Sequence, residues 1–184
     1  MEAIINELES AIESIESKYF SRQERDFAYE LYHQMRLREL PNQVEVTCET
    51  GKKRFNYGDK VFSNRIICEN FFKNNPNVPD FIYRVPDLLI HEYKNREQQL
   101  IAVEIKKNPS NNEILRDLSK LTAYCYGNLN YKKGILMLFK YNRNTIKEYK
   151  QIKELLKQYE KIEIWIITPE KKIDIICSNN INVI

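Results

Sequence analysis

Three charged residues stand at the ends of two apolar runs in VPDLLIHEYKNREQQLIAVEIKK, residues 85–107. Asp87 follows a proline in the first run, and Glu104 and Lys106 stand two residues apart near the end of the second. Charged side chains lose solvation among apolar neighbours, so all three are costly unless they are compensated. Two carboxylates and a lysine can hold a divalent cation and assist the attack of water on a phosphodiester.

The two runs predict the antiparallel strands of a hairpin, with the break KNREQ as its turn. If the loop is centred between Asn95 and Arg96, Asp87 lies opposite Glu104, with Cβ atoms roughly 5 Å apart. Residues two apart point to one face of a strand, so Lys106 joins them. A shift of one residue in this register would separate the two carboxylates.

A divalent cation would remove the repulsion between the carboxylates. Mg²⁺ prefers oxygen ligands and usually takes one or two carboxylates, and Mn²⁺ is the alternative ion. We expect Asp87, Glu104 and the backbone carbonyl of Ile105 to be the protein ligands. Lys106 would orient the attacking water or stabilise charge that develops at phosphorus. The competing interpretation is a strand that starts at Asp87 and an exposed Glu104–Lys106 ion pair, because these residue types are common.

The elements around the hairpin follow from periodicity and turn residues. A helix after the hairpin has a capping box, Ser110 with Glu113, and a stop at Gly127. Residues 50–80 predict no clear element. The order points to an α/β (mixed α+β) fold in which helices pack on a central mixed sheet. The other predicted elements are helices at 2–19, 22–39 and 144–160 and strands at 43–49, 134–141, 162–169 and 172–178.

In this context the motif resembles the PD-(D/E)XK nuclease superfamily, which has the restriction-endonuclease-like fold. The resemblance lies in Pro86-Asp87, in Glu104-Ile105-Lys106 after a hairpin, and in the helix and strand that follow. It implies a core of one helix, a three-stranded meander, a helix and a strand, over about residues 22–141. At 184 residues we expect one domain, 1–184, in which an N-terminal helix (1–21) precedes this core and a C-terminal extension (142–184) follows it.

The resemblance also suggests residues outside the motif. ERDFAYELYHQMR (24–36) is similar to the opening helix of uncharacterised bacterial members, where a glutamate often adds a metal contact. Glu30 is the candidate, and a solvated helix carboxylate is the alternative. His33, one turn further on, either faces the same site or is a packed or surface histidine. Glu69 is a possible further acid.

The helix after the motif contains RDLSKL, which is similar to a pattern in the same members. Lys120 and Arg116 are therefore candidates for binding substrate phosphates. The alternative is that Arg116, Asp117 and Lys120 form one solvated helix face with a local ion pair.

Composition limits the partners. The net charge of +3 does not by itself indicate nucleic-acid binding, but nine Lys or Arg against three Glu in residues 131–161 form either a phosphate-facing patch or a solvated helix face. No apolar run reaches the roughly 18 residues of a membrane helix, and the acidic N-terminus is unlike a signal peptide. Four scattered cysteines and two histidines argue against a zinc site and favour a reducing cytoplasm.

The leading expectation is a Mg²⁺-dependent endonuclease that acts on DNA, with RNA as the alternative substrate. The resemblance implies that a homodimer is possible, so that two sites cut two strands. A second reading is a nuclease-fold binding or assembly module that is inactive without a partner. A third is an unrelated α/β binding protein whose charges are incidental, and it predicts that Asp87, Glu104 and Lys106 are scattered.

Overall fold

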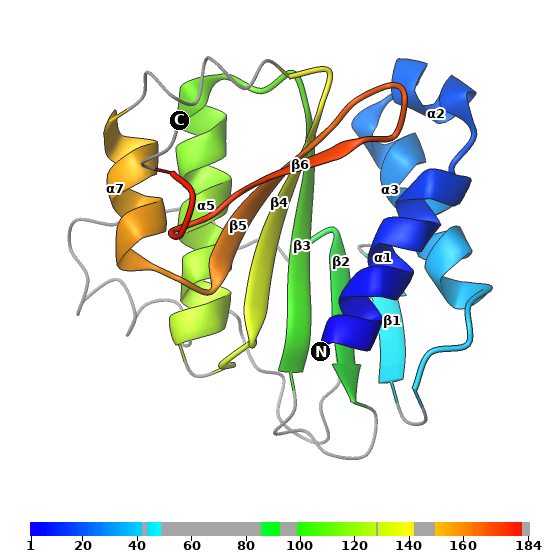
Figure 1. Ribbon diagram of the computed structural model, residues 1–184, viewed down its shortest axis with the longest axis horizontal. Coiled ribbons are helices and arrows are strands. Elements are labelled where there is room, and N and C mark those ends of the chain that lie inside the picture. Colours follow the sequence, from blue (N-terminus) through cyan, green and yellow to red (C-terminus); the bar gives the residue numbers. More distant parts are fainter. Residues whose placement is uncertain (42–43, 49–85, 93–98, 128, 142–149, 182–184) are drawn as a thin grey trace.

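A six-stranded mixed sheet lies at the centre of the computed structural model (Figure 1). The structure describes residues 1–41, 44–48, 86–92, 99–127, 129–141 and 150–181. The strands lie in chain order across the sheet: β1 and β2 are antiparallel to their successors, β3, β4 and β5 are parallel, and β6 is antiparallel to β5. The strands are β1 (Val44–Cys48), β2 (Leu88–Glu92), β3 (Gln99–Lys107), β4 (Lys133–Phe139), β5 (Ile162–Ile167) and β6 (Ile173–Ile176).

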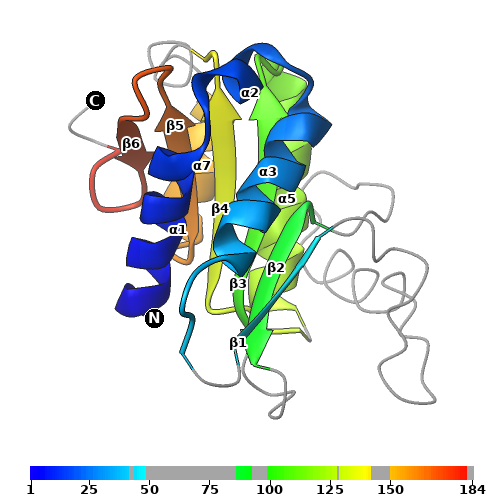
Figure 2. The ribbon, with the colours of Figure 1, turned by 90° about the vertical axis from the view of Figure 1, so that its right-hand side faces the viewer.

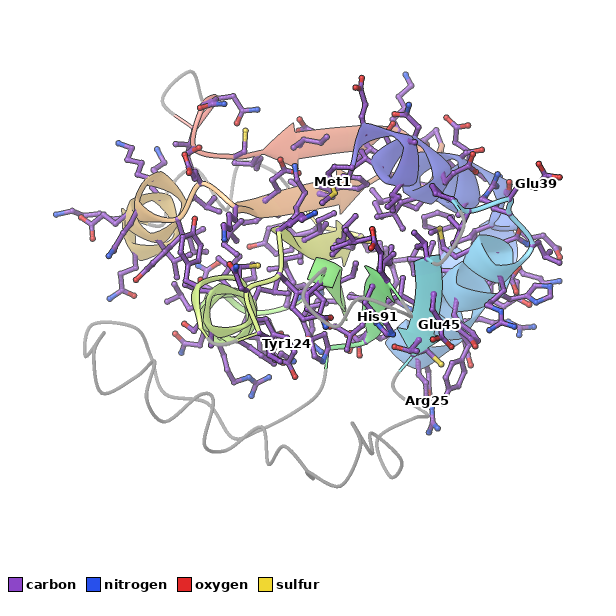
Figure 3. All side chains as sticks on the ribbon, turned by 90° about the horizontal axis from the view of Figure 1, so that it is seen from below. Met1, Arg25, Glu39, Glu45, His91 and Tyr124 are labelled. Carbon is purple, nitrogen blue, oxygen red and sulfur yellow. The ribbon has the colours of Figure 1, made fainter. Side chains whose placement is uncertain are left out.

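Helices cover both faces of the sheet (Figure 1, Figure 2). Met1, at the start of α1, and Tyr124, on α5, lie on opposite sides of the strands (Figure 3). Strand side chains alternate between two apolar cores, one beneath each helical layer. The predicted mixed sheet flanked by helices is thereby confirmed. The first layer holds α1 (Glu2–Ser14), α2 (Ser17–Ser21) and α3 (Glu24–Arg36), and the second holds α5 (Asn111–Tyr126) and α7 (Lys150–Gln158).

The prediction of one continuous helix over residues 2–19 is wrong, because the structure has two helices there. Ile15 and Glu16 have extended backbone, with ψ of 128° and 141°, and they separate α1 from α2. The break turns the chain so that Ile15 and Phe20 are both buried. The ring of Phe20 packs edge-on against that of Phe27, with centroids 5.2 Å apart. Burial of these side chains outweighs the helical periodicity of the local sequence.

Most of the other predicted elements occur with shorter bounds, and β4 begins one residue before the predicted strand 134–141. In α3, the expected inward residues Phe27, Leu31 and Met35 are all fully buried. The strand predicted over residues 43–49 is β1, and the C-terminal extension adds β5 and β6 to the same sheet. Residues 50–80, and with them Glu69, lie outside the described residues, as do the hairpin turn and the beginning of the predicted helix 144–160.

The long helix α5 begins and ends as predicted. The Ser110 hydroxyl accepts a hydrogen bond from the Glu113 N–H, and the Glu113 carboxylate accepts one from the Ser110 N–H. At the other end, the Gly127 N–H donates to the Ala123 carbonyl. This double cap fixes the start of α5 next to the end of β3, which positions the side chains of its second and third turns over the sheet.

No helix in the described part of the chain is both long enough and apolar enough to cross a membrane.

Helix α5 lies close to the sheet at Gly134 of β4. A Cβ at this position would lie 2.8 Å from Ile162 Cδ1, 3.0 Å from Cys125 Sγ and 3.2 Å from Leu121 Cβ. We therefore expect Gly134→Ala to lower the free energy of unfolding by about 1–3 kcal/mol, because the added methyl group overpacks the core. Urea denaturation followed by circular dichroism measures the change.

Gly127→Ala is the matched control. Gly127 has φ of −87°, which other residues adopt without strain, so a small effect is expected there. Equal stability of Gly134→Ala and the wild type would contradict the tight packing of α5 on β4.

Candidate active site

The three residues of the sequence motif meet on the sheet face beneath α5. The register expected for the hairpin is confirmed where Leu88 pairs with Val103, which places Asp87 at the level of Glu104. The Ile105 N–H donates a 2.8 Å hydrogen bond to Asp87 Oδ2. Glu104 and Lys106 follow Ala102 on the α5 side, whereas the side chain of Ile105 points into the opposite core.

Helix α5 adds two buried charged residues to this cluster. Lys120 Nζ lies 2.5 Å from Glu104 Oε1 and 3.6 Å from Asp117 Oδ1. Asp117 Oδ2 lies 4.0 Å from Lys106 Nζ, so Asp117 contacts both lysines. Asp117 and Lys120 are 3% and 5% exposed, and Arg116 is exposed. The alternative of one solvated face for these three residues is therefore wrong.

Helix α3 contributes Glu24, which the sequence analysis did not select. Glu24 Oε1 lies 2.6 Å from Lys106 Nζ, and its Oε2 accepts a 3.2 Å hydrogen bond from the Lys107 N–H. Only the tertiary arrangement brings the first residue of α3 to the end of β3. Its position in the first turn of a predicted helix was the available sequence signal. Acidic residues are common there, however, because the helix dipole stabilises negative charge at the N-terminus.

The predicted extra ligand, Glu30, is placed elsewhere on the same helix. Its carboxylate accepts a 2.8 Å hydrogen bond from Gln34. Six residues after Glu24, it lies about 9 Å further along the axis and about 120° around it. The structure therefore brings Glu24 into the cluster and does not bring Glu30 there. His33 is exposed, as the surface interpretation had it.

Burial dominates the electrostatics of the two motif carboxylates. Glu104 is 1% exposed, and burial raises its pKa well above the ordinary value, an effect that the Lys120 ammonium opposes. Burial also raises the pKa of Asp87, against the hydrogen bond from the Ile105 N–H and the nearby lysines. Both shifts mean that the ionised carboxylates are short of compensating positive charge.

The lysine of the motif is held in its charged form. Burial lowers the pKa of Lys106, but the hydrogen bond to Glu24 and the charges of Asp117, Glu24 and Asp87 together raise it above its ordinary value. Lys106 is therefore an ammonium at neutral pH. It can donate hydrogen bonds and attract negative charge, but it cannot accept a proton.

The cluster contains more acidic than basic side chains and retains an unused acceptor. Four carboxyl groups, Glu24, Asp87, Glu104 and Asp117, face two ammonium groups, Lys106 and Lys120, so with all four ionised two negative charges are unmatched. Among the described residues, Asp117 Oδ2 is a buried oxygen that accepts no hydrogen bond. Glu104 Oε1 is also buried, and its close contact is the Lys120 ammonium, 2.5 Å away.

These properties suit a divalent cation. A charge of +2 would balance the cluster, and buried carboxylate oxygens are ligands that Mg²⁺ accepts. Asp87 and Glu104 are the two carboxylates on adjacent strands that would share it. No three Asp, Glu, His or Cys side chains of the described ranges form a ready metal-binding group, so water or substrate oxygens would have to supply the other positions.

Two further polar features lie away from this cluster. His91 of β2 and Glu45 of β1 lie side by side, with His91 Nε2 3.8 Å from Glu45 Oε2 (Figure 3). Burial lowers the pKa of His91, which favours its neutral form. The basic helix α7 packs against α5, and α5 lies between α7 and β3 (Figure 1). The described lysines of α7 therefore do not adjoin the site.

Comparison of the chain with protein-family models, with curated proteins and with solved structures finds no match in any of the three.

The raised pKa of Glu104 predicts an unusual pH dependence of stability without metal. The folded state keeps a proton that the unfolded chain releases above its ordinary pKa near 4.5. The corresponding stability is present at lower pH and is lost as pH rises toward the raised value. In EDTA, we expect the melting temperature of wild type, relative to that of Glu104→Gln, to fall as the pH is raised above this ordinary value.

Thermal melts of both proteins over a series of pH values measure the difference between their melting temperatures. Groups that titrate in both proteins cancel in this difference. The exposed Glu13→Gln is the control and should follow wild type. Parallel curves for wild type and Glu104→Gln would show that the buried carboxyl does not titrate abnormally.

Proposed function

We propose that this chain is a metal-dependent nuclease that hydrolyses phosphodiester bonds of DNA. The single observation that carries the proposal is Glu104, a carboxylate that is 1% exposed and lies beside Asp87, Asp117 and Lys120. A purely structural core would place an apolar residue at this position of β3. A site that binds a cation and a phosphate would retain these charges.

The topology supports the resemblance to the PD-(D/E)XK superfamily. The elements α3, β1, β2, β3, α5 and β4 follow the implied order of a helix, a three-stranded meander, a helix and a strand. Asp87 directly precedes β2, and Glu104 and Lys106 lie near the end of β3, positions that suit the Asp, the Asp or Glu, and the Lys of that motif. The reading in which these charges are scattered loses its support.

The residues have distinct proposed roles. Asp87 and Glu104 would hold Mg²⁺ or Mn²⁺, which supplies Lewis-acid polarisation and charge neutralisation when bound. Lys106, kept charged and positioned by Glu24, would stabilise the negative charge that develops on the phosphoryl oxygens. Lys120 balances Glu104 without metal and would otherwise contact a phosphate.

A second candidate function is a nuclease-fold module that does not cut without a partner. Both lysines of the cluster are already paired with carboxylates, Lys106 with Glu24 and Lys120 with Glu104. Such a closed network would need substrate, metal or a partner to open it. Metal binding and cleavage, measured separately, distinguish the two candidates.

Binding of metal is the first prediction of the proposal. We expect isothermal titration calorimetry with Mn²⁺ to detect binding to wild type and at least a tenfold loss of affinity in Glu104→Gln, because a charged ligand is removed. Glu30→Gln is the matched control on the surface of α3, and it should bind as wild type does. Equal affinity in Glu104→Gln and wild type would exclude Glu104 as a ligand.

Cleavage is the second prediction. We expect wild type to cut supercoiled plasmid or single-stranded DNA with Mg²⁺ or Mn²⁺ and to be inactive in EDTA. Lys106→Ala and Glu104→Gln should lose about 100-fold or more, the usual cost of removing a transition-state contact. Glu24→Gln should also lose activity, because Lys106 loses its partner, whereas Glu30→Gln should retain it.

The outcomes separate the candidates. Cleavage that survives in both motif variants would place the activity outside this site. Metal binding without cleavage by wild type would support the partner-dependent module.

A further inference from the structure

Three exposed cations surround the junction between α2 and α3, and each lies over a tyrosine ring. Lys18 Nζ and the Arg22 guanidinium both lie 5.2 Å from the centre of the Tyr19 ring. The Arg25 guanidinium lies 5.1 Å from the centre of the Tyr29 ring. Lys18, Arg22 and Arg25 are exposed, and both tyrosines are half-buried. We call these five residues the tyrosine-backed basic surface.

Arg25 is held more firmly than an ordinary surface arginine. Its Nε and one terminal nitrogen donate hydrogen bonds of 2.8 and 2.6 Å to the Tyr29 hydroxyl. These contacts, together with the ring beneath the guanidinium, restrict its rotamers. An arginine that is already ordered loses less side-chain entropy when it binds an anion.

The basic surface adjoins the candidate active site through the backbone. Lys107 Nζ donates hydrogen bonds to the carbonyl oxygens of Ser21 and Arg22, at the end of α2. Glu24, between Arg22 and Arg25 in sequence, binds Lys106. The end of β3 therefore contacts the α2–α3 junction, and this short segment connects the two arginines to the catalytic candidates. Arg25 extends away from the fold on the side of the sheet where Tyr124 of α5 lies (Figure 3).

The charges of the two arginines are available to a ligand. Within the described part of the chain, no carboxylate forms an ion pair with Arg22 or Arg25, whereas Lys18 pairs with Glu16 at 2.8 Å. Two uncompensated guanidinium groups on aromatic rings are suited to phosphate oxygens, which they bind in a bidentate manner. Guanidinium planes also stack on unpaired bases. A nucleic-acid strand offers both groups at once.

We propose that the tyrosine-backed basic surface binds the phosphate backbone of a nucleic-acid strand that leads into the Asp87–Glu104 site. This inference rests on the proposed function, for which it identifies where the substrate strand lies outside the cluster. Arg22 and Arg25 are the main contacts, Tyr29 positions Arg25, and Lys18 adds a peripheral charge.

The test is binding without cleavage. Fluorescence anisotropy with a labelled 20-nucleotide DNA strand, in EDTA at several salt concentrations, measures affinity independently of catalysis. We expect Arg22→Gln/Arg25→Gln to bind about tenfold or more weakly at low salt. The slope of log K against log salt should fall by about 1.4, because each lost phosphate contact on a single strand removes about 0.7. Tyr29→Phe, which frees Arg25, should give a smaller loss of affinity.

The matched control removes two exposed positive charges elsewhere, in Arg36→Gln/Lys157→Gln. It should keep affinity within about twofold and the salt slope within about 0.3 of wild type. Equal losses in the two double variants would overturn the inference, because the binding would then depend only on net charge. Absence of any binding by wild type would also overturn it.

The cleavage assay separates this result from the proposed function. If wild type cuts DNA and the arginine variant binds and cuts as well as wild type, the nuclease stands and the basic surface is not its contact. If the arginine variant alone loses binding and wild type does not cut, the surface is a nucleic-acid site and the proposed hydrolysis is wrong.

Discussion

The buried contact between Glu104 and Lys120 is the constraint on which the arrangement of the site depends. A carboxylate in the core of a sheet protein destabilises the fold unless opposite charge accompanies it. Here the compensating ammonium comes from α5, so the helix must lie at a fixed depth and rotation over β3. The double cap at Ser110 and the close packing at Gly134 fix that position from two directions. Residues outside the motif thus determine its electrostatics.

The two faces of strand β3 have different roles: one packs in the apolar core and the other carries the charged cluster. Val103 and Ile105 pack into the core beneath α1 and α3, and Glu104 and Lys106 point to the α5 side. The alternation of a β-strand therefore lets one segment stabilise the fold and carry the polar cluster. The same alternation places Asp87, which precedes Leu88, on the face of the sheet that Glu104 occupies.

The sequence was sufficient for what local rules determine. The hairpin register at Leu88–Ile90 followed from two apolar runs and one polar break, but its shift by one residue between Ile90 and His91 did not. The bounds of α5 followed from Ser110 and Gly127. It was insufficient where distant segments decide. The break between α1 and α2 depends on the burial of Ile15 and Phe20, which local periodicity does not reveal. Burial of Asp117 and Lys120 likewise depends on which face of α5 meets the sheet.

The glutamate of α3 that joins the cluster is Glu24 and not the predicted Glu30. The resemblance suggested a glutamate on the opening helix, and α3 has two within six residues of one another. The sequence does not reveal which of the two glutamates faces the motif, because that depends on where the axis of α3 lies. In the structure, Lys106 Nζ and the Lys107 N–H both donate hydrogen bonds to Glu24. Glu24 thereby connects the charged cluster to the α2–α3 junction. A substrate strand that contacted Arg22 and Arg25 would therefore act on the same short segment that positions Lys106, and its binding would be coupled to the orientation of this lysine.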